Sequence, residues 1–243
     1  MGMFGDGAAL RKSNLPAQCR SRHLPPPQKC NCPDHTARHP LIQIVQSPRT
    51  RYPVPMRIIS GHLRGRPLLG PPSDTTRPIT DRAKQSLFDY LSSCYEGGTV
   101  LDCFAGTGSM GLECLSRGAA RAIFIERDRG ALDHLRKNID ALQLADKSFI
   151  LPIDAYKAGD HPDLRNLVVA FVDPPYSHMA TGHLRHKIDR LVQSLAHHAM
   201  VDGGIISLRH PANVSVDAPA MGVKVIREME YGDMAITWLT RSP

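Results

Sequence analysis

The stretch from Leu101 to Glu113, LDCFAGTGSMGLE, decides how this chain folds. It begins at the end of a short strand-like run, 99–101, and contains a literal G-x-G-x-x-G at Gly106, Gly108 and Gly111. A strand, a glycine turn and a helix in this order form the first unit of a nucleotide-binding α/β sheet, in which the glycines let the backbone approach a ligand. The stretch therefore predicts a ligand site at the carboxyl end of a parallel strand.

The same alternation continues outward from this stretch. Apolar runs predict strands at 99–104, 122–126, 149–153, 167–173 and 204–209, and helical patterning lies near 80–93, 108–117, 128–142 and 181–198. Strands that alternate with helices indicate an α/β fold, a parallel sheet covered on both faces. The end differs, because VKVIREMEY and MAITWLT flank Gly232-Asp233 and predict a tight antiparallel hairpin.

Composition divides the chain near Met56. Residues 1–55 carry eight Lys or Arg against two Asp or Glu and hold nine of the twenty prolines, so we expect a disordered basic leader. This leader either lies upstream of the true start at Met56 or is a dispensable tail. From 56 to 243 we expect one domain, which opens with a basic hairpin at 56–72. We predict phosphate contacts from three arginines of this hairpin, Arg57, Arg64 and Arg66, although a solvated basic edge is the alternative.

Asp102 separates two interpretations of the glycine turn. The turn, together with Glu126 at the end of the second strand, suits the ribose of either NAD or S-adenosylmethionine. A carboxylate beside a pyrophosphate would cost on the order of a few kcal/mol in a partly desolvated cleft, whereas the same carboxylate attracts a sulfonium and an ammonium. The charge of Asp102 therefore favours S-adenosyl-L-methionine. The alternative is that Asp102 only caps the turn by accepting backbone N–H groups.

The second motif is Asp173-Pro174-Pro175-Tyr176, which follows the apolar run LVVAFV. Two prolines fix the backbone and remove two N–H donors, so the Asp173 carboxylate and the Pro174 carbonyl remain as acceptors beside an aromatic ring. This arrangement suits a planar exocyclic amino group whose ring stacks on Tyr176, a contact worth about 1–3 kcal/mol. The motif therefore predicts a site for methylation of a base amine.

Taken together, five segments resemble the RsmD family: MRIISGHLRGRPL, TRPITDRAKQSLFDYL, LDCFAGTGSMGLECLSRGA, FVDPPY and YGDMAITWL. The resemblance runs from Met56 to about Leu239. It implies S-adenosylmethionine-dependent methylation of the exocyclic N2 of one guanine in small-subunit (16S) ribosomal RNA, on the assembling subunit. It also implies a Rossmann-like class I methyltransferase fold, a seven-stranded sheet of order 3-2-1-4-5-7-6 with strand 7 antiparallel.

By position, the resemblance assigns roles to residues of this chain. The cofactor loop would be Asp102, Phe104, Ala105, Gly106 and Gly108, with Glu126 at the ribose, Asp154 and Ala155 beside the adenine, and Arg77, Pro78 and Thr80 over the methionine end. The catalytic motif would be Asp173, Pro174, Pro175 and Tyr176, which would hold the target base. One departure stands out, because SLRHP puts Arg209 and His210 where an acidic residue is expected.

Three other functions stay open at this point. Asp-Pro-Pro-Tyr also serves DNA adenine-N6 and cytosine-N4 methyltransferases, and the glycine turn also serves NAD(P)-dependent oxidoreductases. A non-catalytic RNA-binding assembly factor could keep the same fold. We predict no metal site, since no His, Cys or carboxylate spacing forms a strong ligand pattern. The chain has no apolar run long enough for a bilayer, and we expect a cytoplasmic monomer with reduced cysteines.

Overall fold

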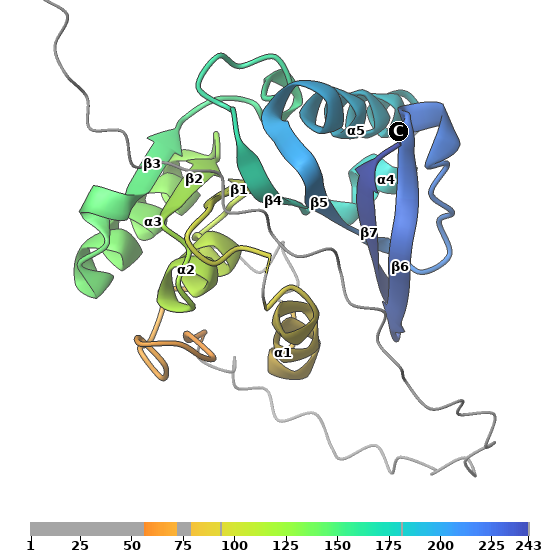
Figure 1. Cartoon of the computed structure of the whole chain (residues 1–243). Coiled ribbons are helices and arrows are strands. Elements are labelled where there is room, and N and C mark those ends of the chain that lie inside the picture. The colour runs from red at the N-terminus through yellow and green to blue at the C-terminus, as the bar shows by residue number, and fades with distance from the viewer. Residues whose placement is uncertain (1–55, 72–78, 93, 181, 243) are drawn as a thin grey trace, which may run out of the picture. The chain divides into compact units, whose positions relative to one another are not determined.

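The computed structural model describes residues 56–71, 79–92, 94–180 and 182–242 (Figure 1). Seven strands form one sheet in the order β3-β2-β1-β4-β5-β7-β6. They are β1 (Thr99–Cys103), β2 (Arg121–Ile125), β3 (Ser148–Leu151), β4 (Leu167–Val172), β5 (Met200–Pro211), β6 (Val223–Tyr231) and β7 (Met234–Arg241). Strands β1 to β5 pair in parallel, and β7 is antiparallel to both β5 and β6. The predicted α/β fold, the strand order and the antiparallel last strand are confirmed.

Helices cover both faces of the sheet (Figure 1). One face carries α1 (Asp81–Tyr90), α2 (Ser109–Ser116) and α3 (Arg129–Leu142), and the other carries α4 (Tyr176–Ala180) and α5 (Gly182–Ser194). Successive strand residues point to opposite faces, so Val100 joins the core under α1–α3 and Leu101 joins the core under α5. Burial of each such side chain stabilises the fold by about 1.5–3 kcal/mol, which explains why the central parts of the parallel strands are mostly apolar.

Two predicted boundaries differ from the structure. The helix expected at 181–198 is α5 followed by a π-helical turn, η3 (Leu195–Ala199), and the short helix α4 begins earlier, inside the Asp-Pro-Pro-Tyr motif. Strand β5 begins at Met200 rather than at 204, because the strand continues through an irregularity: Leu167 pairs with Met200, but Val169 pairs with Ile205. The residues between, VDGG, have the composition of a turn and hide the start of the strand.

The N-terminal hairpin closes on a single antiparallel bridge between Arg57 and Pro67. Polar side chains of the helices, rather than a strand ladder, hold it in place. The Glu113 carboxylate of α2 accepts the N–H groups of Ile59 and Ser60, each at 2.9 Å, and Asn138 Oδ1 of α3 accepts the N–H of Leu69 at 2.8 Å. These bonds satisfy backbone groups that a missing strand partner would otherwise leave unpaired.

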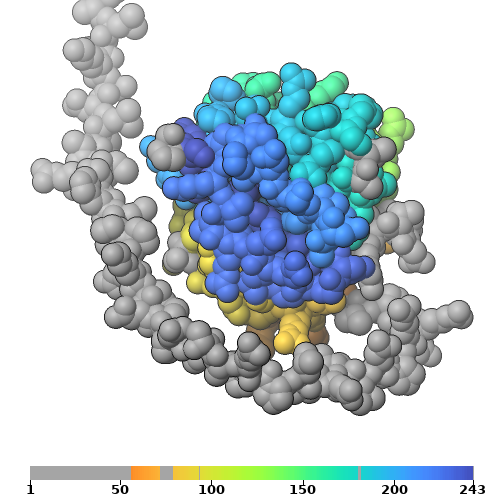
Figure 2. Space-filling view, turned by 90° about the vertical axis from the view of Figure 1, so that its right-hand side faces the viewer, coloured from red at the N-terminus to blue at the C-terminus, as the bar shows by residue number. Residues whose placement is uncertain are grey.

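Strand β6 is an edge of the sheet, and the blue C-terminal part of the chain forms the surface that faces the viewer in Figure 2. Val225 and Ile226 of β6 are exposed, but Lys224, Arg227 and Glu228 stand beside them. Charged side chains along an edge strand oppose pairing with another sheet. Among the described residues, no helix has the length and apolar character needed to cross a membrane.

Candidate active site at the strand ends

The glycine turn leads from β1 into α2 through three residues with positive φ: Phe104 at 67°, Gly106 at 56° and Gly108 at 85°. A Cβ on Gly108 would lie 2.4 Å from Leu135 Cδ1, and one on Gly111 would lie 2.4 Å from Phe124 Cε1. A Cβ on Gly106 would meet no atom within 4 Å. Gly108 and Gly111 therefore serve helix packing, whereas Gly106 borders open space at the tip of the turn.

Asp102 lies under the turn and is buried. Its Oδ2 accepts the N–H of Gly111 at 2.9 Å, so it caps the first turn of α2, as the capping alternative expected. Burial raises the pKa of Asp102 to about 7, and the nearby Asp173 charge adds to the rise, while the N–H groups of Gly111 and Met110 and the Lys84 ammonium oppose it. Only the charged form of this carboxylate would attract a cationic ligand, so that role of Asp102 stays a prediction.

Glu126 lies directly after β2 and joins the two strand ends. Its Oε2 accepts the Gly106 N–H at 2.8 Å, and its Oε1 accepts the N–H groups of Arg127 and Asp128, each at 2.8 Å. These bonds fix the carboxylate at the carboxyl edge of the sheet beside the open tip of the turn. Its position agrees with a partner for ligand hydroxyls, the role that the sequence predicted.

The other predicted cofactor residues lie at this edge or outside the described residues. Asp154 Oδ1 accepts the N–H of Tyr156 at 3.2 Å and its Oδ2 accepts Arg127 Nη1 at 3.1 Å, while Ala155 is buried in the turn η2 (Ala155–Lys157). Thr80 is the N-cap of α1, and its hydroxyl accepts the N–H of Ala83 at 3.3 Å. Arg77 and Pro78 fall outside the described residues.

The Asp-Pro-Pro-Tyr motif follows β4, the strand next to β1. Cys103 and Val172 are paired in register, and the N–H of Asp173 donates to the Cys103 carbonyl at 3.4 Å. The motif and the glycine turn therefore leave the sheet side by side. Pro174 is buried, Pro175 is exposed, and Tyr176 begins α4.

Arg209 of β5 binds the Asp173 carboxylate. Its Nε donates to Asp173 Oδ1 at 2.5 Å, and its guanidinium carbon lies 5.8 Å from the centre of the Tyr176 ring. Burial raises the pKa of Asp173, and the Arg209 charge and hydrogen bond oppose this rise. A small cavity of about 20 Å³ borders the pair, with Ile79, Met110 and Ile236 among its lining residues.

The three arginines predicted to contact RNA differ in whether their guanidinium groups already bond to the protein. Arg57 Nη2 bonds to Asp81 Oδ2 at 3.0 Å, and Arg66 Nη2 donates to the Ala141 carbonyl at 2.6 Å. Arg64 is exposed. Two of the three thus already have protein partners.

Sequence reasoning missed a buried ion pair behind the turn. Lys84 Nζ of α1 lies 3.0 Å from Glu113 Oε2 and also donates to Ser109 Oγ at 3.0 Å, and both charged side chains are almost fully buried. The signal was present, because Lys84 falls on the same helical stripe as Leu87 and Leu91. The pair ties α1 to α2, the helix that begins at the glycine turn.

Comparison with known proteins shows which family model and which proteins this chain resembles. A family model described as "Conserved hypothetical protein 95" matches residues 56–240. The chain is 32% identical over 179 residues to "Putative rRNA methyltransferase YlbH" of Bacillus subtilis, covering 73% of this chain and 94% of that relative. It is 42% identical over 125 residues to "Ribosomal RNA small subunit methyltransferase D" of Escherichia coli, covering 50% and 60%. The solved "Putative methyltransferase yhhF from Escherichia coli" aligns with a TM-score of 0.64 and 30% identity, covering 77% of this chain and 98% of that one.

Proposed function

Because the chain belongs to the RsmD family, the group represented by that family model, we propose that it methylates ribosomal RNA and that the acceptor is the exocyclic N2 of a guanine in the small subunit. The observation that carries this proposal is the pairing of β1 with β4, which sets the glycine turn and Asp173 at the same edge of the sheet. Named relatives are ribosomal RNA methyltransferases, which favours this function over dinucleotide oxidoreduction. We further propose that the monomer acts on the assembling subunit.

We propose S-adenosyl-L-methionine as the cofactor, because named relatives of the chain are methyltransferases and the residues at the turn fit this ligand. The open space at Gly106 admits a ligand against the backbone, and the Glu126 carboxylate lies beside it, where ribose hydroxyls would donate. Glu126 and the charged form of Asp102 place negative charge near the turn, which agrees with a cationic ligand and opposes a pyrophosphate. When bound, the cofactor supplies an electrophilic methyl group on a sulfonium.

The Asp-Pro-Pro-Tyr residues then prepare the amine. The Asp173 carboxylate and the Pro174 carbonyl accept the two N–H groups, which directs the nitrogen lone pair out of the base plane, and the Tyr176 ring stacks on the base. The sulfonium would give up its methyl group, with the electron pair of the broken S–C bond left on sulfur, and positive charge would then develop on the amine nitrogen beside Asp173. Asp173 stabilises this charge and accepts the departing proton, which then passes to water.

Arg209 has a defined part in this proposal. Its planar guanidinium donates to Asp173 and lies over Tyr176, which is the arrangement we propose for the base itself. The entering amino group therefore replaces the Arg209 N–H at the carboxylate. Until then Arg209 favours the charged form of Asp173, the form that can stabilise positive charge on the nitrogen and accept its proton.

Replacement of Asp173 tests the proposal. We expect Asp173→Ala to lose at least about 100-fold in methyl transfer, the scale of one lost charge-stabilising group, while RNA and cofactor binding stay near wild type. Matched RNA and DNA substrates, digested to nucleosides after reaction, measure the product. Methylation by Asp173→Ala at the wild-type rate would contradict the assigned role, and methylation of DNA alone would favour the DNA-amine alternative.

A further inference from the structure

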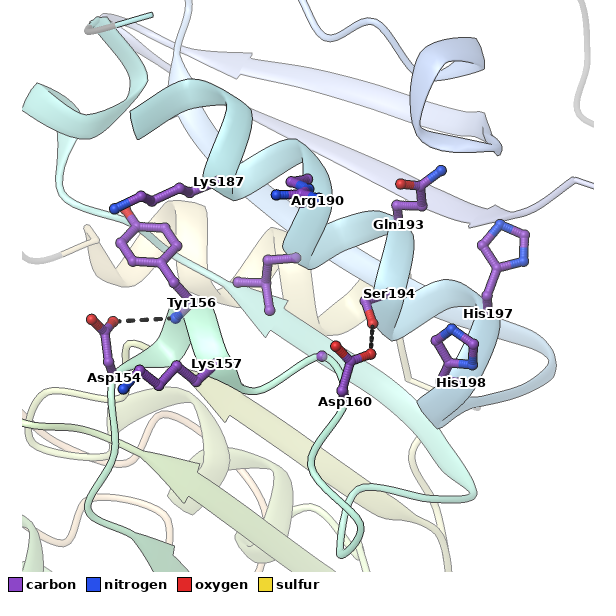
Figure 3. A pocket seen from close by; sticks show the side chains of 12 residues that line it. Asp154, Tyr156, Lys157, Asp160, Lys187, Arg190, Gln193, Ser194, His197 and His198 are labelled. Carbon is purple, nitrogen blue, oxygen red and sulfur yellow. Dashed lines mark hydrogen bonds between the residues drawn. The ribbon is translucent and has the colours of Figure 1, made fainter. Parts of the chain in front are cut away.

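A groove lies between the β3–β4 connection and α5, next to the candidate active site (Figure 3). Its volume is about 820 Å³. One wall is η2 with the residues after it, and the other is α5 as it continues into η3. A parallel crossover usually carries a full helix, but residues 152–166 contain only the short turn η2. The groove fills the space that such a helix would occupy.

Basic side chains line both walls of this α5 groove. They are Lys157 on the first wall and Lys187, Arg190, His197 and His198 on the second. Of the two carboxylates of the groove, Asp154 pairs with Arg127 Nη1 at 3.1 Å, whereas Asp160 accepts the neutral Ser194 hydroxyl at 2.7 Å and keeps its charge. Figure 3 shows the Asp160–Ser194 bond. The three lysine and arginine charges of the groove therefore exceed the one carboxylate charge that no described cation pairs with. Within the described ranges, no ion pair compensates the three lysine and arginine charges. The groove therefore attracts anions.

The two basic residues of α5 that line the groove lie on one stripe of the helix. Lys187, Arg190 and Ser194 follow one another at helical spacing and reach the groove, while Ile188 and Val192 are buried in the core. From Lys187 to His198 the helical rise spans about 16 Å. A nucleic-acid strand in a helix carries a charge every 3.4 Å or so, so the stripe extends along several phosphates rather than one.

The groove also reaches the proposed base pocket. Asp154 belongs both to the groove and to the predicted cofactor site. Tyr156 lines the groove, and its hydroxyl lies 2.7 Å from His178 Nδ1 of α4, the helix that begins with Tyr176. A strand bound in the groove would thus lie beside the nucleotide held at Tyr176.

We propose that the α5 groove binds the sugar–phosphate backbone of the RNA strand that flanks the target nucleotide. This inference rests on the proposed function, because it takes RNA as the substrate. Lys157, Lys187 and Arg190 contact phosphates, and such contacts position the strand without reading its sequence. The groove supplies free cations that the N-terminal hairpin lacks at Arg57 and Arg66, where protein groups already bind the guanidinium.

The double variant Lys187→Gln/Arg190→Gln tests the groove. The full-length protein is titrated into a fluorescein-labelled RNA of about 20 nucleotides at several salt concentrations. Each lost phosphate contact lowers the slope of log K against log salt by about 0.7–0.9, so we expect a slope smaller by about 1.5. A matched control, Arg136→Gln/Lys137→Gln on α3, removes the same charge from the other face of the sheet and should leave the slope near the wild-type value.

Calorimetry with S-adenosyl-L-homocysteine separates the outcomes. Wild-type cofactor affinity in the groove variant, with a reduced salt slope, supports the groove. An unchanged slope, a reduction no larger than that of the α3 control, or a lost cofactor affinity overturns it. If the wild-type protein binds the cofactor but no RNA, both the proposed function and the groove assignment are contradicted. If the wild-type protein binds RNA but the groove variant keeps the wild-type salt slope, only the groove assignment is contradicted.

Discussion

The Asp173 side chain is half-buried, yet it has to be ionised if it is to stabilise the positive charge that develops on the target amine. Burial raises its pKa, and Arg209 is the group that opposes this rise. Asp102, which lies near the end of the neighbouring strand, is a second acid at the same edge of the sheet, and the Asp173 charge adds to the rise of the Asp102 pKa that burial causes. At the scale of the residue, activity therefore depends on one guanidinium that holds a carboxylate in its charged form.

Substitution of Arg209 should change the pH dependence of methyl transfer. In Arg209→Met the pKa of Asp173 rises further. The fall of kcat/KM on the acid side of the pH profile should therefore occur at a higher pH than in the wild type. Arg209→Lys keeps a positive charge and should fall between the two. At alkaline pH, where Asp173 is charged in all three proteins, the Met variant should recover activity.

A pH–rate series of kcat/KM for the three proteins measures this effect. A merely structural role for Arg209 would lower activity at every pH and leave the acid limb in place. Identical acid limbs in the wild type, the Lys variant and the Met variant would therefore contradict the assigned role.

At the scale of the element, the join between β1 and α2 depends on close contact of backbone with side chain. Gly111 of α2 faces the buried ring of Phe124 in β2, and an added methyl would lie 2.4 Å from Cε1. Phe124 is fully buried in the core under α1–α3. The third glycine of the motif therefore sets how near the helix lies to the sheet.

Gly111→Ala should lower the free energy of unfolding by about 1–3 kcal/mol, the cost of overpacking a core. Gly106→Ala is the matched control, since a methyl there meets no atom within 4 Å and only the φ of 56° opposes it, a cost of about 1 kcal/mol. Urea denaturation measures both. Adding Phe124→Leu to Gly111→Ala should restore part of the loss; a Gly111 variant as stable as the wild type would contradict the packing argument.

The elements themselves differ in how far sequence could predict them. Strands β1, β2 and β4 were predictable because burial on both faces makes each a continuous apolar run. The start of β5 could not be predicted, since Gly203 and Gly204 lie inside the strand and glycine pairs are typical of turns. The anchoring of the N-terminal hairpin by Glu113 could not be predicted either, because the bonds of Glu113 to Ile59 and Ser60 join positions more than fifty residues apart.

For the candidate site, sequence predicted which residues gather at the edge but not how they are paired. Asp102, Glu126 and Asp173 each lie at or near the carboxyl end of a predicted strand, and parallel strands end at one edge, so their proximity followed from the pattern. The Asp173–Arg209 ion pair depends on the register between β4 and β5, which no local pattern encodes. Arg209 was visible only as an unexpected basic residue.

At the scale of the whole molecule, the account joins three regions: the glycine turn and the Asp-Pro-Pro-Tyr motif at the carboxyl edge of the sheet, and the α5 groove, which begins near that edge at Asp154 and runs along α5 to His197 and His198. The glycine turn suits a cationic methyl donor, the Asp-Pro-Pro-Tyr motif suits a base amine, and the α5 groove suits a polyanionic strand. Together they describe a methyltransferase for a base in RNA. The identity of that base is the central claim.

One measurement tests this claim most directly. Ribosomal particles that lack the modification are incubated with the protein and S-adenosyl-L-methionine carrying an isotopically labelled methyl group, and the RNA is digested to nucleosides for mass spectrometry. The account predicts label in N2-methylguanosine from small-subunit RNA. Label in N6-methyladenosine or N4-methylcytidine, or no label in any nucleoside, would contradict it.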